Sequence, residues 1–176
     1  MKKLVLLLCV VAFTVSAKAQ IYLGGSFNIT HDGDRDATEF TLAPEIGYKL
    51  NKNWEFGAEI GYTHNSKDWA YKDEDFDVNS FHFAPYARWS YLNKGMFHLF
   101  LEGGFGFSTS KVEDHDSKNG FEIGIKPGMA FDVADHFSFI AKFGFLGYRD
   151  DYKYDNSVSG ISVNTEDLSI GFVYSF

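Results

Sequence analysis

Apolar and polar residues alternate along most of this chain, and the alternation keeps a single parity within each of eight runs. Successive side chains of a strand point to opposite faces, so each run predicts a strand with one apolar and one polar face. The expected strands cover residues 21–29, 40–50, 54–62, 81–91, 97–107, 121–131, 137–145 and 168–176. The seventh is expected to place Phe137, Phe139, Ala141, Phe143 and Phe145 on its apolar face. With no convincing helix-period segment, an all-β fold is expected.

The connections between these runs alternate in length. The short ones are residues 51–53, 92–96 and 132–136, and the long polar ones are residues 30–38, 64–79, 109–119 and 149–166. An even number of strands joined in this way is typical of a closed up-and-down barrel in a bacterial outer membrane, with short periplasmic turns and long outer loops. Alternation alone leaves open a soluble eight-stranded barrel whose apolar face lines the interior.

The amino-terminal segment has the form of a secretion signal. Two lysines precede an apolar run over residues 4–15, and Ala-Lys-Ala at 17–19 has the small-x-small form of a cleavage site. The run of 12 residues is shorter than the roughly 20 that a membrane-spanning helix needs. We therefore expect residues 1–19 to be a signal peptide and residues 20–176 to be the outer-membrane β-barrel domain.

The final run ends on an aromatic residue, with an apolar residue at every second position before it. Its apolar face consists of Leu168, Ile170, Phe172, Tyr174 and Phe176. This pattern resembles the last strand of small bacterial outer-membrane barrels of the OmpX/OmpA-barrel type. The resemblance implies a monomeric, porin-like, eight-stranded antiparallel up-and-down transmembrane β-barrel in a Gram-negative outer membrane. It also implies contact with the lipid bilayer and lipopolysaccharide, and a role for Tyr174 and Phe176 as the signal read by the barrel assembly machinery.

Charge and candidate ligands narrow the range of partners. The formal net charge is −8, and removal of the leader with its three lysines makes the chain more acidic, which disfavours binding to nucleic acid. A D-x-D-x-D run at residues 32–36 resembles the start of a calcium loop, but the twelfth position is Ala43 rather than Glu, which excludes an EF-hand. We expect no cofactor and no resident metal; weak binding of divalent cations by the acidic loops is the alternative.

Charged residues of both signs recur at similar heights on the polar faces of the expected strands. They are Glu45, Glu59, Arg88, Glu102, Lys126 and Lys142. The interior of an eight-stranded barrel is only wide enough for side chains to fill, and an unpaired charge confined there is costly. We expect these residues to form an ion-pair network that plugs the lumen. A narrow pore for small solutes is the alternative.

Two families of barrels of similar size act on lipid A, and their sequence signatures bear on an enzymatic role. The deacylase type uses a His-x-Ser-Asn segment, whereas the segments that begin at His115 and His136 here match only His-x-Ser. The palmitoyltransferase type has an amphipathic helix before the barrel, but here the first strand is expected from Ile21. We expect no catalytic residues and no enzymatic activity, with a lipid A-modifying enzyme as the remaining alternative.

The long loops are the expected site of surface interaction, since function is often carried by loops on a rigid scaffold. They are acidic, and two of them contain aromatic residues among their charges. Residues 64–79 and 149–166 are the candidate recognition surface, with Trp69, Phe76, Tyr152 and Tyr154 as its apolar contacts. The sequence predicts a barrel that serves surface interaction or membrane integrity, and it does not identify the extracellular ligand.

Overall fold

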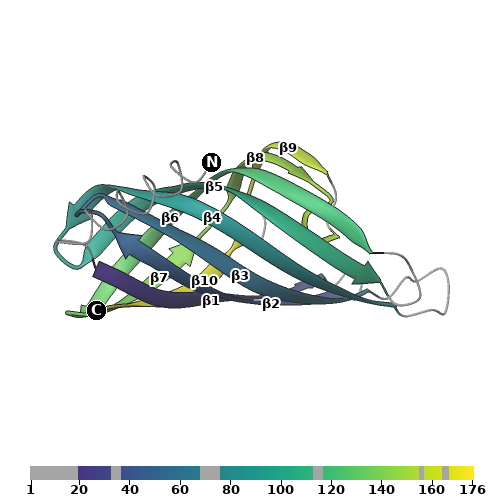
Figure 1. Ribbon diagram of the computed structural model, residues 1–176, viewed down its shortest axis with the longest axis horizontal. Helices are drawn as coiled ribbons and strands as arrows, with labels where there is room; N and C mark the ends of the chain where they lie inside the picture. Colours follow the sequence, from purple (N-terminus) through teal and green to yellow (C-terminus); the bar gives the residue numbers. More distant parts are fainter. Residues whose placement is uncertain (1–19, 33–36, 68–75, 113–116, 155–156, 164–166) are drawn as a thin grey trace, which may run out of the picture.

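The computed structural model describes residues 20–32, 37–67, 76–112, 117–154, 157–163 and 167–176. Within them the chain forms an antiparallel barrel (Figure 1). Its elements are β1 (Gln20–Asp32), β2 (Ala37–Lys49), β3 (Trp54–Lys67), β4 (Phe76–Lys94), β5 (Phe97–Val112), β6 (Lys118–Ala134), β7 (Phe137–Lys142), β8 (Phe145–Asp150), η2 (Tyr152–Tyr154), β9 (Val158–Ser162) and β10 (Ser169–Ser175). None of the described ranges contains a helix long and apolar enough to cross a membrane.

The sheet closes on itself through its first and last strands. β1 pairs with β2 along its whole length and with β10 from Tyr22↔Ser175 to Phe27↔Ile170. β10 continues the wall to β7, β7 and β8 both pair with β6, and β6 pairs with β5. β7 and β8 occupy one position in the wall, and β9 and β10 occupy the next one, so the ten strands form a closed eight-stranded barrel, as the sequence predicts. The beginning of β1 and the carboxy-terminus lie at the same end (Figure 1).

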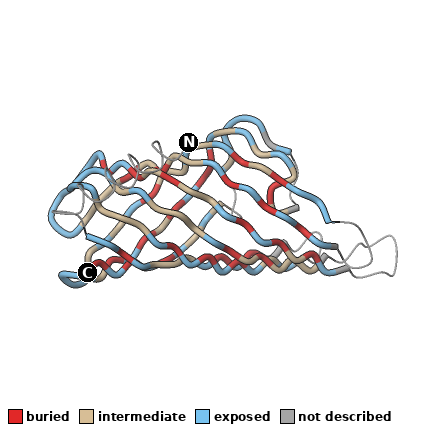
Figure 2. The backbone as a smooth tube through the Cα atoms, in the orientation of Figure 1, coloured by how far each residue is buried: buried red, intermediate tan, exposed pale blue. Residues whose placement is uncertain are grey.

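The expected parity of the strands is confirmed over nearly the whole wall. Buried and exposed positions alternate along each strand (Figure 2). On β2, for example, Ile46 faces outward while its neighbour Glu45 is buried in the interior. The apolar face is therefore outside and the polar face inside, which excludes the soluble barrel with an apolar lumen.

The two ends of the barrel differ as expected, although the strands are longer than the sequence indicates. The short turns are tight, and Gly95 adopts φ +61° in the turn after β4. At the other end β3 and β4 stay paired as far as Lys67↔Phe76. Much of the region expected as loop in residues 64–79 is therefore a continuation of the strands.

The seventh wall position contradicts the expected pattern. Gly144 has φ +74° between β7 and β8, and this irregularity reverses the parity of the residues that follow. Phe145 is 1% exposed inside the barrel instead of lying on the apolar outer face, so that prediction is wrong. The long loop expected over residues 149–166 is also partly structured, because it contains η2 and β9.

Candidate functional site: the charged lumen

Arg88 is the centre of the charge network inside the barrel. Its side chain is 2% exposed on β4, and its guanidinium donates to Glu102 Oε2 at 2.7 and 3.0 Å. The same group lies 3.1 Å from Glu55 Oε2 and 3.3 Å from Glu45 Oε2. It also lies 4.8 Å from the centre of the Phe100 ring. One cation thus joins carboxylates from β2, β3 and β5.

Lys142 extends this network across the lumen from β7. Its ammonium lies 3.1 Å from Glu59 Oε2, 3.2 Å from Glu102 Oε1 and 3.9 Å from Glu45 Oε2. Glu59 also lies 3.1 Å from the ring nitrogen Nε2 of His82. Five of the six residues expected in the network, Glu45, Glu59, Arg88, Glu102 and Lys142, are therefore brought together.

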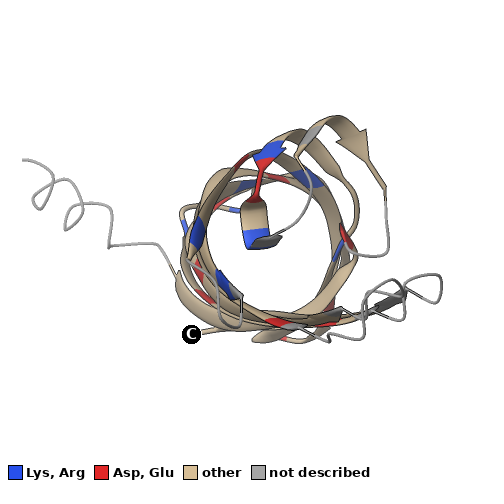
Figure 3. Cartoon of the chain, turned by 90° about the vertical axis from the view of Figure 1, so that its right-hand side faces the viewer, with Lys and Arg blue, Asp and Glu red and all other residues tan. Residues whose placement is uncertain are grey.

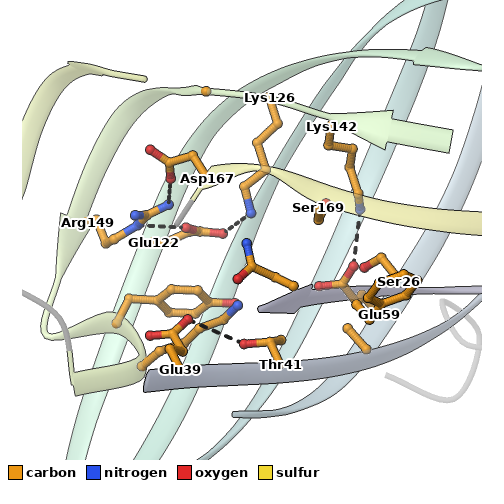
Figure 4. Close-up of a pocket in the computed structure, with 16 residues that line it drawn as sticks. Ser26, Glu39, Thr41, Glu59, Glu122, Lys126, Lys142, Arg149, Asp167 and Ser169 are labelled. Atoms are coloured by element: carbon orange, nitrogen blue, oxygen red, sulfur yellow. Dashed lines mark hydrogen bonds and ion pairs between the residues drawn. The ribbon is translucent and has the colours of Figure 1, made fainter. Parts of the chain in front are cut away.

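The sixth, Lys126, belongs to a second group. Its ammonium lies 2.5 Å from Glu122, which also accepts from Arg149 Nε at 3.0 Å (Figure 4). Arg149 in turn contacts Asp167 at 3.2 Å. The sequence did not indicate this second group, because Arg149 and Asp167 were placed in a loop and its margin.

The segment η2 lies inside the ring of strands when the barrel is viewed from its long-loop end (Figure 3). Tyr152 is 2% exposed, and its ring lies 5.9 Å from that of His82. The backbone N–H of Lys153 donates to the hydroxyl of Ser108 at 2.9 Å. The inward-facing Gly106 provides the room, since a Cβ at that position would lie 2.6 Å from the Tyr152 hydroxyl.

This placement corrects one member of the candidate recognition surface. Tyr152 is buried in the lumen, so it supplies no contact to an external partner. The same burial raises the pKa of its phenol well above the ordinary value. Trp69 and the side chains of Phe76 and Tyr154 lie outside the described residues.

Two inward tyrosines were missed by the sequence reasoning. The hydroxyls of Tyr22 and Tyr86 lie 2.8 Å apart, and Tyr86 donates to Glu45 at 2.9 Å. A Cβ on Gly47 would lie 2.1 Å from the Tyr22 ring, and a Cβ on Gly57 would lie 2.6 Å from the Tyr86 ring. The glycines on the polar faces were the available signal, because each leaves space for a large neighbour across a narrow lumen.

At the short-turn end, His98, Asp132 and Ser138 lie close together, but they are not arranged as a catalytic triad. Asp132 accepts from Ser138 at 2.6 Å and lies 2.8 Å from His98 Nε2, so the carboxylate separates the hydroxyl from the imidazole. A nucleophilic serine needs the imidazole itself within reach as its base. His136 Nδ1 instead lies 2.7 Å from the carbonyl oxygen of Ser175. The other His-x-Ser segment begins at His115, outside the described residues.

Comparison with known proteins identifies the family. The family model described as the outer membrane protein beta-barrel domain matches residues 4–176. The chain belongs to this family. As a member of it, the protein is located in the outer membrane, where its apolar outer face contacts the lipid bilayer. No curated protein sequence matches the chain.

Solved structures of similar architecture include three small outer-membrane proteins. Neisserial surface protein A is 15% identical with a TM-score of 0.55, and the match covers 90% of this chain and 97% of that chain. The attachment invasion locus protein Ail of Yersinia pestis is 16% identical, with a TM-score of 0.46 and coverage of 90% and 97%. OprG of Pseudomonas aeruginosa is 12% identical, with a TM-score of 0.48 and coverage of 90% and 94%. At this identity the likeness to Neisserial surface protein A bears on the fold alone.

Proposed function

We propose that this family member is a non-enzymatic outer-membrane barrel whose lumen is plugged by its own side chains, and whose outer end serves surface interaction or membrane integrity. The observation that carries the proposal is the pair of cations that cross-link the interior. Arg88 and Lys142 each contact three carboxylates, and they share Glu45 and Glu102.

The lumen below this network supports the same proposal. Tyr22, Phe100, Ile140 and Val173 form a buried apolar cluster in the interior. Ions do not cross an apolar constriction readily, because they would lose their hydration there. A layer of paired charges next to an apolar layer favours a closed barrel over a narrow pore.

We expect the purified barrel to show no stable unitary conductance in planar lipid bilayers at neutral pH. A pore-forming barrel inserted under the same conditions serves as the control for insertion and detection. Reproducible unitary currents from the unmodified protein would instead support the narrow pore for small solutes.

The outer end is proposed to interact with a basic or cation-bridged partner, and lipopolysaccharide with bridging divalent cations is one candidate. The support is compositional: residues 73–77 read Asp-Glu-Asp-Phe-Asp, and aromatic Trp69 lies close by in the sequence. Exposed aromatic residues among charges are common in recognition surfaces, and attraction between surface charges is screened by salt.

Replacing residues 64–79 with an Asn-Gly turn is expected to leave folding nearly intact, because Thr63 and Ser80 are already ladder partners. Adhesion of expressing cells to immobilised matrix proteins, or their survival in serum, should change, and the difference should shrink as salt is added. The matched variant keeps the loop but replaces Asp73, Glu74, Asp75 and Asp77 with their amides. If both variants behave like the parent in these assays, the recognition role is refuted and a structural role in the membrane remains.

A further inference from the structure

A cavity of about 230 Å³ lies at the short-turn end of the lumen. Exposed residues line its mouth, namely Asn51 and Lys52 in the turn after β2 and Asn93 near the end of β4. The short turns of a barrel of this kind face the periplasm. Pockets for drug-sized ligands measure roughly 300–1,000 Å³. This cavity therefore suits a smaller molecule that arrives from the periplasm.

The floor of the cavity, defined by Phe100 of β5, Ile140 of β7 and Val173 of β10, is apolar. These side chains are 1%, 7% and 2% exposed, and they belong to the buried apolar cluster of the interior. Ala130 of β6 packs against the same cluster and also lines the cavity. An aliphatic group placed on this floor would leave water, which is favourable.

The wall of the cavity formed by β2 and the turn after it is cationic. Lys49 at the end of β2 and Lys52 in the turn both line the cavity. The Lys49 ammonium lies 3.7 Å from Glu55, a carboxylate that already lies 3.1 Å from Arg88. Two lysines on this wall thus face one carboxylate that is shared with a third cation. The wall favours an anionic group on a ligand.

The opposite wall carries a carboxylate. In the ring of eight wall positions, the β6–β7 turn lies across the lumen from the β2–β3 turn. Asp132, near the end of β6, lines the cavity on that side, and its side chain is 42% exposed. One of its oxygens accepts from Ser138 at 2.6 Å, and the other lies 2.8 Å from His98 Nε2. A carboxylate has about four acceptor positions, so Asp132 can also accept from an ammonium.

A chain of contacts around the mouth holds the two walls in place. The second ring nitrogen of His98, Nδ1, lies 2.8 Å from Asn93 Oδ1. The amide nitrogen of Asn93 donates to the carbonyl oxygen of Lys52 at 3.3 Å. The contacts therefore run from Lys52 through Asn93 and His98 to Asp132. Groups that are positioned before a ligand arrives bind it at a lower cost in entropy.

We propose that this cavity binds a free aliphatic α-amino acid, such as leucine, from the periplasm. The carboxylate lies between Lys49 and Lys52, the ammonium lies against Asp132, and the side chain lies on the floor. A zwitterion with its two charges side by side and an apolar group beside them matches charged walls above an apolar floor. A carboxylic acid without an amino group would leave Asp132 without a counter-charge. The site lies on the short-turn side of Arg88, so it does not depend on a partner at the outer end.

The test titrates the purified full-length barrel in a non-ionic detergent with leucine, at about pH 8, where an imidazole is ordinarily neutral. Methyl NMR signals of Ile140 and Val173 should shift along one binding curve, whereas those of the outward-facing Ile46 should not move. Isocaproate is leucine without its ammonium, and isoamylamine is leucine without its carboxylate. Each should bind about tenfold more weakly, as expected for loss of a charge-assisted contact. Glycine, which has no side chain to place on the floor, should also bind more weakly.

Protein variants then assign each charge of the ligand to its wall. Asp132→Asn should weaken leucine binding about tenfold without weakening isocaproate, which has no ammonium to lose a partner. The double variant Lys49→Gln with Lys52→Gln should weaken leucine and isocaproate without weakening isoamylamine. Lys94→Gln, at an exposed position of the same end, is the matched control and should have no effect.

Three results would overturn the proposal. The first is that leucine leaves the Ile140 and Val173 signals unmoved. The second is that isocaproate or isoamylamine binds the parent as tightly as leucine does. This comparison uses the unmodified protein, so it holds even if a variant fails to fold. The third is that Asp132→Asn keeps the full preference of the parent for leucine over isocaproate.

Discussion

Arg88→Met is expected to lower the free energy of unfolding by about 3–5 kcal/mol, the usual cost of removing one partner of a buried ion pair. The guanidinium is almost fully enclosed, and its loss leaves Glu45, Glu55 and Glu102 facing one another. Lys142 still contacts Glu45 and Glu102, and Lys49 lies 3.7 Å from Glu55 near the edge of the network. Urea titration in lipid vesicles, followed by tryptophan fluorescence, gives the measurement.

Two further variants separate charge from packing. Lys94→Met, at an exposed position beside a short turn, should change stability by less than about 0.5 kcal/mol. Adding Glu45→Gln and Glu55→Gln to Arg88→Met should restore at least half of the loss, because Glu102 and Glu59 can still pair with Lys142. If Arg88→Met stays within about 1 kcal/mol of the parent, water fills the lumen and screens these charges, and the plug as proposed is absent.

Deletion of Phe176 is expected to leave most of the protein unassembled in the periplasm. The backbone N–H of Phe176 donates to Ile21 at 3.0 Å, so the residue extends the β1–β10 junction that closes the wall. Its ring lies 5.2 Å from that of Tyr174, and both face outward, as a signal presented to assembly machinery requires. The fraction of heat-modifiable protein in isolated outer membranes measures assembly.

The control for this deletion is Phe139→Ala, which removes another outward-facing, exposed aromatic residue, from the middle of β7. It should cost some stability without blocking insertion. Equal assembly of the deletion variant and the parent would show that Tyr174 and Phe176 contribute apolar surface but no signal.

The sequence was sufficient to predict which residues of the barrel wall face inward, because the period-2 alternation of a strand depends only on neighbouring residues. Residues of β2, and those of β4 before the irregularity at Ser90–Leu92, face inward or outward according to their parity. The burial of Glu45 and Arg88 follows from that alone. Five of the six expected network residues meet because charges of opposite sign at one height of a narrow lumen have few other partners.

The wrong predictions lie where the alternation of inward and outward residues is interrupted and depends on pairing with distant strands. Gly144 was an available signal for an irregularity in the seventh run, but its φ of +74° and the reversal that follows depend on pairing with β6 and β10. Phe145, Arg149 and Tyr152 were misplaced for this reason. Lys126 was assigned to the wrong carboxylates. Its partner Glu122 lies on its own strand, and Arg149, the other partner of Glu122, faces inward only because parity reverses after Gly144.

The contacts of Lys142 also bear on the order of events during assembly. Lys142 and Glu59 are separated by 83 residues and meet only across the finished lumen. Before the wall closes, these side chains remain hydrated, and they help to keep the secreted chain soluble despite its aromatic outer face. Arg88 can already meet Glu55 and Glu102 on its neighbouring strands β3 and β5. Lys142 on β7 meets Glu59 on β3 and Glu45 on β2 only across the lumen, so closure exchanges its hydration for ion pairs in one step. The interior thus favours an all-or-none transition, in which half-closed barrels carry a penalty that both the unfolded chain and the complete barrel avoid.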